Sequence, residues 1–203
     1  CTGASGFLDA SSSMNTSNNF ALGLTMASGA HMVDFGGRID ANGNGLQGIA
    51  IDSKSGLDLD AGEQVHAVGN AGDGVHLEVG STLTIFNTPQ FSGVSATTTL
   101  TAQGNGANGI NLLSNSTMYV VNYAALQVSG NTAAGVAADD GSALTFAQSV
   151  PVTGVTTNIS ANRPDVLLSF ASRLTTLAND AIAQVHCDAT SAARGPAAVT
   201  CPH

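Results

Sequence analysis

Short segments with alternating hydrophobic and polar residues recur along the whole chain. Each contains two apolar residues separated by one other residue, as at Leu24 and Met26 or at Ile49 and Ile51. An alternation with period two is typical of β-strands with one buried face, whereas amphipathic helices repeat every 3.6 residues. No 3.6-residue period holds across these segments. The pattern therefore predicts short β-strands.

The segments align in three columns that repeat together. The first column starts at Leu24, Ile49, Val75, Ile110, Val136 and Val166. The second starts at Met32, Leu57, Leu83, Met118, Leu144 and Leu174. The third starts at Met14, Ile39, Val65, Leu100, Leu126 and Thr157. Asp34 and Thr176 take apolar positions of the second column near the two ends of the array, and terminal repeats are expected to be atypical.

An asparagine follows each third segment, and we expect these residues to form a ladder. They lie 25 to 35 residues apart, at Asn19, Asn44, Asn70, Asn105, Asn131 and Asn162. An amide side chain both donates and accepts hydrogen bonds, so stacked asparagines can satisfy a buried turn. A second bend is predicted at a column of small residues, Ser55, Ser81, Ser116, Ser142 and Ser172.

Glycine follows the asparagine by four residues in five repeats. The column contains Gly23, Gly48, Gly74, Gly109 and Gly135, and the sixth, shorter repeat has Asp165 instead. We expect this position to require a positive φ, which glycine adopts freely and aspartate tolerates better than most residues.

The repeats predict an all-β fold, a right-handed parallel β-helix of about 6–7 coils with three short strands per coil and an Asn ladder. Residues 1–203 are expected to form a single β-solenoid domain with insert loops near residues 86–99 and 147–156. Over residues 4–203 the chain resembles the pectin-lyase-like β-helix superfamily, and its Gly- and Asn-rich coils resemble autotransporter passenger domains. This architecture serves lyases, hydrolases, adhesins and spacers, so it does not define a function.

Composition narrows the class of partner. Only 9% of the residues are charged and the net charge is −9, with five basic residues: Arg38, Lys54, Arg163, Arg173 and Arg194. Nucleic acids and anionic membranes attract clustered basic faces, so we expect neither as a partner. No apolar run approaches the roughly 20 residues of a membrane span. The composition favours an exported protein, extracellular or on the cell surface.

Three cysteines bear on the compartment. Cys187 and Cys201 are 14 residues apart, and we place Cys187 with Val185 in the third column. A disulfide between them would close a C-terminal coil over residues 181–203 and indicate an oxidising compartment; two buried thiols are the alternative. Cys1 is left over, and intermolecular pairing, a free thiol and lipidation stay open for it.

Catalytic signals are weak. The superfamily resemblance implies, for a lyase, a basic residue and a calcium-binding carboxylate cluster, and for a hydrolase, paired aspartates with Gly-His-Gly and Arg-x-Lys; none of these strings occurs. Asp139 aligns with Glu78 as one isolated acidic pair. The histidines fall in different columns and are expected to be single surface residues: His31, His66, His76, His186 and His203. We predict no metal and no cofactor, and whether the chain is an enzyme stays uncertain.

The sequence thus favours a non-enzymatic extracellular structural or adhesive β-solenoid that self-assembles head to tail, with copies of itself as partner. The alternative is a carbohydrate-binding or carbohydrate-modifying β-helix, with surface carbohydrate as partner. Its site would be an acidic groove or the loop that carries Phe86 and Phe91. An ice-binding face is a third hypothesis, but its outward threonines are interrupted by Asp58 and Tyr119.

Overall fold

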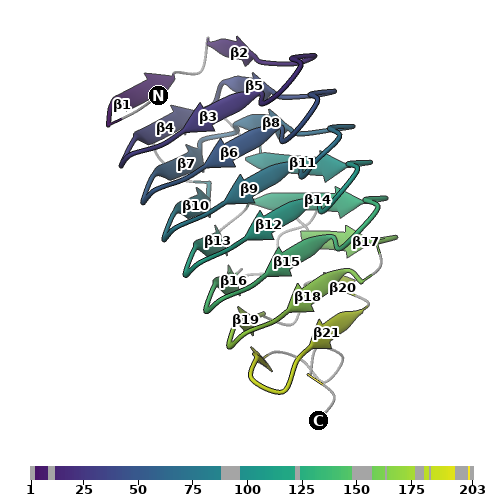
Figure 1. The fold of residues 1–203 in the computed structure, drawn as a ribbon. Coiled ribbons are helices and arrows are strands. Elements are labelled where there is room, and N and C mark those ends of the chain that lie inside the picture. Colours follow the sequence, from purple (N-terminus) through teal and green to yellow (C-terminus); the bar gives the residue numbers. More distant parts are fainter. Residues whose placement is uncertain are drawn as a thin grey trace.

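The structure is a computed structural model of the 203-residue chain. It describes residues 3–8, 12–87, 97–121, 124–147, 157–162, 164–176, 181–182, 184–194 and 201. These residues form three parallel sheets that run the length of the molecule (Figure 1).

Each sheet takes one strand from each coil. The first sheet contains β3 (Leu24–Met26), β6 (Ile49–Ile51), β9 (Val75–Leu77), β12 (Ile110–Leu112), β15 (Val136–Ala138), β18 (Val166–Leu168) and β21 (Val185–Cys187). The second sheet contains β1 (Ser5–Leu8), β4 (His31–Phe35), β7 (Gly56–Asp60), β10 (Thr82–Ile85), β13 (Thr117–Val121), β16 (Ala143–Ala147), β19 (Arg173–Thr175) and β22 (Ala192–Arg194). The third sheet contains β2 (Ser13–Asn15), β5 (Arg38–Asp40), β8 (Gln64–His66), β11 (Thr99–Gln103), β14 (Ala125–Ser129), β17 (Thr157–Ser160) and β20 (Ala181–Ile182).

The predicted parallel β-helix with three strands per coil is confirmed. The chain runs from first to second to third sheet and then steps to the next coil (Figure 1). The register keeps the predicted columns, with Leu24 opposite Ile49 and Ile49 opposite Val75. These side chains alternate inward and join one continuous core. Burying each large aliphatic side chain contributes about 1.5–3 kcal/mol, so the stack of coils stabilises itself along its axis.

The predicted asparagine ladder lies inside the corner between the third and first sheets. Each Nδ2 donates to the Oδ1 of the asparagine in the next coil, as Asn70 does to Asn105 at 3.1 Å and Asn105 to Asn131 at 2.9 Å. The same oxygens accept the backbone N–H, at 3.0 Å in both cases. Each amide therefore satisfies backbone and side chain of its neighbour, which a buried turn requires.

The expected positive φ at the glycine after each asparagine is wrong. Positive φ values occur one residue before the asparagine instead, as at Gly69, with a φ of 66° before Asn70. The glycines four residues after the asparagines are required because the next coil leaves no space for a side chain there. A Cβ on Gly74 would lie 2.6 Å from the Gly109 oxygen and 2.7 Å from Asn105 Nδ2.

Asp165 ends the ladder by a related mechanism. Its Oδ1 accepts from Asn162 N at 3.3 Å and from Asn162 Nδ2 at 3.5 Å, and so replaces the next asparagine. Gly135, at the same place one coil earlier, faces Asn162 Nδ2, where a Cβ would approach to 2.6 Å. The side chain of Asp165 fits because it takes the ladder position itself.

The serine column is confirmed at the corner between the first and second sheets. Ser116 is fully buried, and its N–H donates to Ser142 Oγ at 3.2 Å. Two consecutive residues with positive φ precede it, Ser114 at 52° and Asn115 at 62°. Ser191 extends the column, since its Oγ accepts from Ser172 N at 3.2 Å.

The predicted disulfide between Cys187 and Cys201 is present. Its place in the repeat was predicted wrongly. Cys187 pairs with Leu168 in the first sheet, whereas we had placed it in the third column. The last coil is the reason, because Ser172 and Ser191 are only 19 residues apart while Ser116 and Ser142 are 26 apart.

Most of the two predicted insert loops lies outside the described residues. Residues 86–87 and 97–99 belong to the first loop, and residue 147 to the second. Phe86 is half-buried, and its N–H continues the ladder of β10 by donating to the Leu59 oxygen at 3.0 Å. Phe91 and Cys1 lie outside the described residues, so the proposals made for them stay predictions.

Candidate binding face of the second sheet

The outward face of the second sheet is polar and rich in hydroxyl groups. Alternation along each strand directs Thr84, Tyr119 and Thr145 outward in one column, in register with each other. Tyr119 is 41% exposed. Two shallow hollows lie on this face, one towards each end of the array. The face is therefore a surface on which a ligand could contact several coils.

The first hollow contains a histidine–carboxylate pair. It has a volume of about 470 Å3, and His31 Nε2 lies 3.1 Å from Asp58 Oδ2 across it. Gly56 is opposite His31 in the register, and a Cβ there would approach the imidazole to 2.7 Å. The glycine therefore leaves room for the ring. Both side chains remain open to solvent, so the pair is a polar surface contact.

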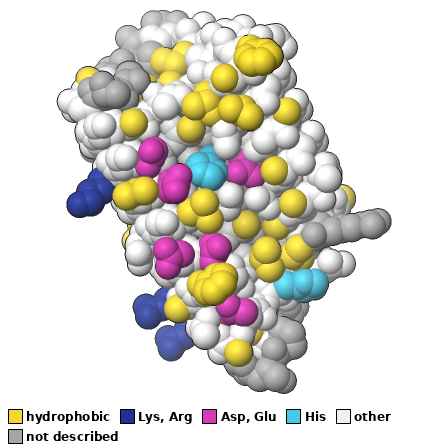
Figure 2. All heavy atoms as spheres, viewed as in Figure 1, with side chains coloured by type: hydrophobic (Ala, Val, Ile, Leu, Met, Phe, Trp, Pro, Cys, Tyr) yellow, Lys and Arg dark blue, Asp and Glu magenta, His cyan; other side chains and the backbone are white. Residues whose placement is uncertain are grey.

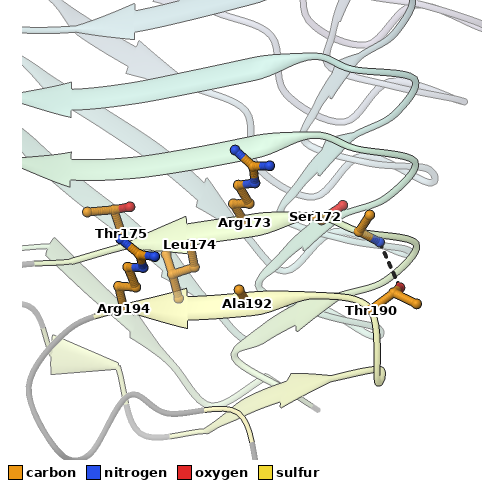
Figure 3. A pocket seen from close by; sticks show the side chains of 8 residues that line it. Ser172, Arg173, Leu174, Thr175, Thr190, Ala192 and Arg194 are labelled. Atoms are coloured by element: carbon orange, nitrogen blue, oxygen red, sulfur yellow. Dashed lines mark hydrogen bonds between the residues drawn. The ribbon is translucent and has the colours of Figure 1, made fainter.

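The second hollow contains two arginines. It has a volume of about 570 Å3, and Arg173 and Arg194 project from β19 and β22 (Figure 3). The two arginines are diagonal to each other, because Arg173 is opposite Ala192 and Arg194 is opposite Thr175 in the register. Two of the five basic residues of the chain thus line one hollow.

A separate cluster lies on the first sheet, where acidic side chains flank a histidine (Figure 2). His76 Nδ1 lies 2.9 Å from Asp73 Oδ2, and His76 Nε2 lies 3.6 Å from Glu78 Oε2. Asp73 also accepts from Asn108 Nδ2 at 3.0 Å and from Asn111 Nδ2 at 3.1 Å. The hydrogen bond that the His76 ring donates to the Asp73 carboxylate raises the pKa of His76, against the effect of burial. Burial alone would raise the pKa of Asp73, but its hydrogen bonds lower it below the ordinary value.

The contacts of this cluster support a structural role rather than a catalytic one. Both imidazole nitrogens of His76 face carboxylates, and three neighbouring side chains already donate to Asp73. A general base needs a free lone pair directed at a substrate proton. The arrangement instead joins β9 to the next coil, so we assign it a structural role.

Three of the histidines that the sequence places singly in different columns have a carboxylate partner, which the sequence analysis did not predict. His31 and His76 have the partners just described, and His66 Nδ1 lies 3.7 Å from Asp40 Oδ1. Asp40 and His66 are opposite each other in the register, so the same column alignment that located the core could have found this pair. His186 is exposed, and His203 lies outside the described residues.

A second feature missed by the sequence analysis is a pair of buried acids. Asp34 and Glu63 are fully buried near the corner between the second and third sheets. Burial and a hydrogen bond with Asp34 raise the pKa of Glu63 to about 9. With a pKa of about 9, the Glu63 carboxyl group carries its proton at neutral pH. The neighbouring Glu63 thus explains why an aspartate, Asp34, occupies an apolar position of the repeat.

No group of three or more His, Cys, Asp or Glu side chains in the described part of the chain could hold a metal ion. The same residues contain no helix that is long and apolar enough to cross a membrane. Comparison of the chain with protein-family models, with curated proteins and with solved structures finds no significant match. The function is therefore argued from the geometry alone.

Proposed function

We propose that this protein is an exported, non-enzymatic β-solenoid with a structural or adhesive role outside the cell or on its surface. The observation that carries the proposal is the uninterrupted ladder of Asn19 to Asn162. The ladder provides hydrogen bonds at one corner of each successive coil along the array. Coils that repeat every 4.8 Å give a stiff rod of roughly 30 Å over the array. Such a rod is suited to holding a surface at a distance.

Two further observations support export and the lack of catalysis. A disulfide between Cys187 and Cys201 is stable in an oxidising compartment. Both ring nitrogens of His76 face carboxylates, which leaves this histidine without a free lone pair for a general base. We also infer that the chain is a distant member of the pectin-lyase-like superfamily, because its repeat pattern resembles that of the superfamily.

The test is an assay for chemistry together with localisation. Purified protein should release no reducing or unsaturated ends from neutral or acidic polysaccharides, with or without calcium. In cells that produce it naturally, antibody should label it on intact cells or in the medium. Sugar release that is lost in Glu78→Gln or Asp139→Asn would replace this proposal with a carbohydrate-modifying enzyme. Retention of the protein inside intact cells would also overturn it.

Self-assembly is the second part of the proposal. Within the described residues, β1, β2 and β3 at one end have one partner strand each, as do β20, β21 and β22 at the other. Unpaired strand edges are templates for another chain. Contact between unlike ends that does not close into a ring gives an open filament.

A further inference from the structure

The arginine hollow lies at the C-terminal end of the second sheet. Arg173 and Arg194 are diagonal neighbours on adjacent strands, because Arg173 is opposite Ala192 and Arg194 is opposite Thr175. Figure 3 shows both side chains on the outward side of the strands. Both arginines are exposed to solvent.

The charge of these two arginines is not compensated within the described residues. No ion pair there involves either residue, whereas Arg38 contacts Asp40 at 2.6 Å. Asp188 lies in the turn before β22, and its carboxylate accepts from Phe170 N at 2.6 Å and from Thr190 Oγ1 at 2.9 Å; Asp139, in the turn before β16, accepts from Ser169 Oγ at 3.0 Å. The hydrogen bond from the Phe170 backbone lowers the pKa of Asp188 below its ordinary value. This aspartate is thus committed to the turn.

The surroundings leave both guanidinium groups open. Ala143 precedes Arg173 in its column and Ala192 follows it, so small side chains lie on both sides. Thr175 adds an exposed hydroxyl beside Arg194. Two like charges held together repel each other, and an anion between them would offset that repulsion. The planar fork of arginine matches the oxygens of a carboxylate or a sulfate.

The continuation of this face identifies the class of ligand. Arg194, Thr175, Thr145 and Tyr119 follow one another in a single outward column. Tyr119 and Arg194 are three strands apart, roughly 14 Å at the usual strand spacing. A half-exposed aromatic ring and a row of hydroxyls suit sugar rings, and an open hollow suits a chain better than a small enclosed molecule. The net charge of −9 repels every polyanion, so binding of an acidic polysaccharide depends on the local charge of the two arginines and on the hydroxyls and aromatic ring beside them.

We propose that Arg173 and Arg194 bind the carboxylate or sulfate groups of an acidic polysaccharide that lies along the second sheet towards Tyr119. The proposal deepens the adhesive role above and rests on it, because it names the surface to which the rod would adhere. It requires no catalysis.

The experiment is affinity electrophoresis of the intact chain in gels containing polygalacturonate, dextran sulfate or neutral dextran. We expect retardation by one or both acidic polymers, which separates carboxylate from sulfate recognition, and none by neutral dextran. The double variant Arg173→Gln/Arg194→Gln should lose affinity by about tenfold or more, which corresponds to about 1.4 kcal/mol. Arg173→Lys/Arg194→Lys should recover only part of the affinity, because lysine lacks the fork.

The matched control is Arg38→Gln/Lys54→Gln, which changes the net charge equally at positions outside the arginine hollow; Lys54 lines the first hollow, towards the other end of the face. It should bind like the unaltered protein, and all variants should have the same circular dichroism and melting temperature. An equal loss of affinity in the control and test variants would show that only net charge matters and would overturn the site. Absence of binding to either acidic polymer, or stronger binding to phosphatidylserine vesicles, would also overturn it. Neither result would affect the assay for sugar release, so the two proposals can fail separately.

Discussion

At the scale of single residues, glycine meets a different requirement at each of two positions near the ladder asparagine Asn70. Gly69 precedes the ladder residue and has a φ of 66°, while Gly74 follows it and has no space for a side chain. The first requirement concerns the conformation of one residue. The second concerns the approach of two coils, and it arises because the ladder asparagine of the next coil occupies the space.

Alanine substitutions at these two glycines should separate the two requirements. In Gly74→Ala the new Cβ meets the Gly109 oxygen at 2.6 Å and the Ala67 oxygen at 3.0 Å, which are backbone atoms with little freedom to move. We expect a loss of about 3 kcal/mol in the free energy of unfolding. Gly69→Ala meets nothing within 4 Å and should cost about 1 kcal/mol, for the left-handed conformation alone. Urea denaturation measures both, and a larger effect at Gly69 would contradict this account.

Asn105→Ala should destabilise more than Asn19→Ala. Asn105 is fully buried, and its side chain accepts from Asn70 and donates to the Ala67 oxygen and to Asn131. Its loss leaves several buried groups without partners, at a cost of roughly 3 kcal/mol. Asn19 is exposed at the end of the ladder, so water can replace its contacts. Equal and small effects on the free energy of unfolding would refute the ladder as a source of stability.

At the scale of strands and turns, the buried acids join the turn after β7 to β4. Glu63 has a pKa of about 9 in the folded state against an ordinary value of 4.5, so the folded chain holds a proton that the unfolded chain releases. The resulting stabilisation is complete below pH 4.5 and is lost as the pH rises towards 9. This pair therefore favours the fold in mildly acidic surroundings.

We predict that Glu63→Gln flattens the fall of stability between pH 4.5 and 9. Glutamine keeps a hydrogen-bonding group in the corner but does not titrate. Unfolding by urea at pH 4.5, 7 and 9 gives the free energies for both proteins, and the difference between them removes the contributions of His76 and other groups. Parallel curves for the two proteins would show that Glu63 titrates normally.

The disulfide stabilises the last coil and with it one half of the arginine hollow. Cys187 ends β21, and β22 with Arg194 lies between Cys187 and Cys201. Closing a loop of this length contributes roughly 3 kcal/mol in the chain-entropy model. Cys187→Ser should therefore increase hydrogen exchange in β22 and weaken binding of the acidic polysaccharide. Cys1→Ser is the control and should change neither; unchanged exchange in Cys187→Ser would contradict the prediction.

At the scale of the whole molecule, the outermost strands of each sheet have one partner strand each within the described residues. If coils of different copies pair there, particle mass should grow with concentration in light scattering, and filaments should be visible by negative-stain microscopy. Cys1 of one copy could then bridge to its neighbour and give oligomers on non-reducing gels that disappear in Cys1→Ser. A monomer at the highest attainable concentration would refute axial assembly and leave the fold unaffected.

Much of the fold could be predicted from the sequence because a solenoid is nearly one-dimensional. Each residue contacts the same position one coil away, so aligning the repeats also aligns contacts. The core columns, the asparagine ladder and the buried serines all follow from this rule. The Cys187–Cys201 disulfide rested on the cysteine spacing instead. The rule fails where the repeat length changes, and the last coil of 19 residues placed Cys187 in a different sheet from the one expected.

The tertiary structure alone decided contacts between residues at different positions of the repeat. His31 and Asp58 are diagonal neighbours on the paired strands β4 and β7, and the conformations of their side chains bring them to 3.1 Å. Asp34 and Glu63 are 29 residues apart and share no repeat position, yet both point into one corner. The arginine pair is diagonal across β19 and β22, in a shortened coil. The sequence determined which residues stack because stacking repeats along one axis. Contacts across the coil depend on its shape in cross-section, which the period of the repeat does not specify.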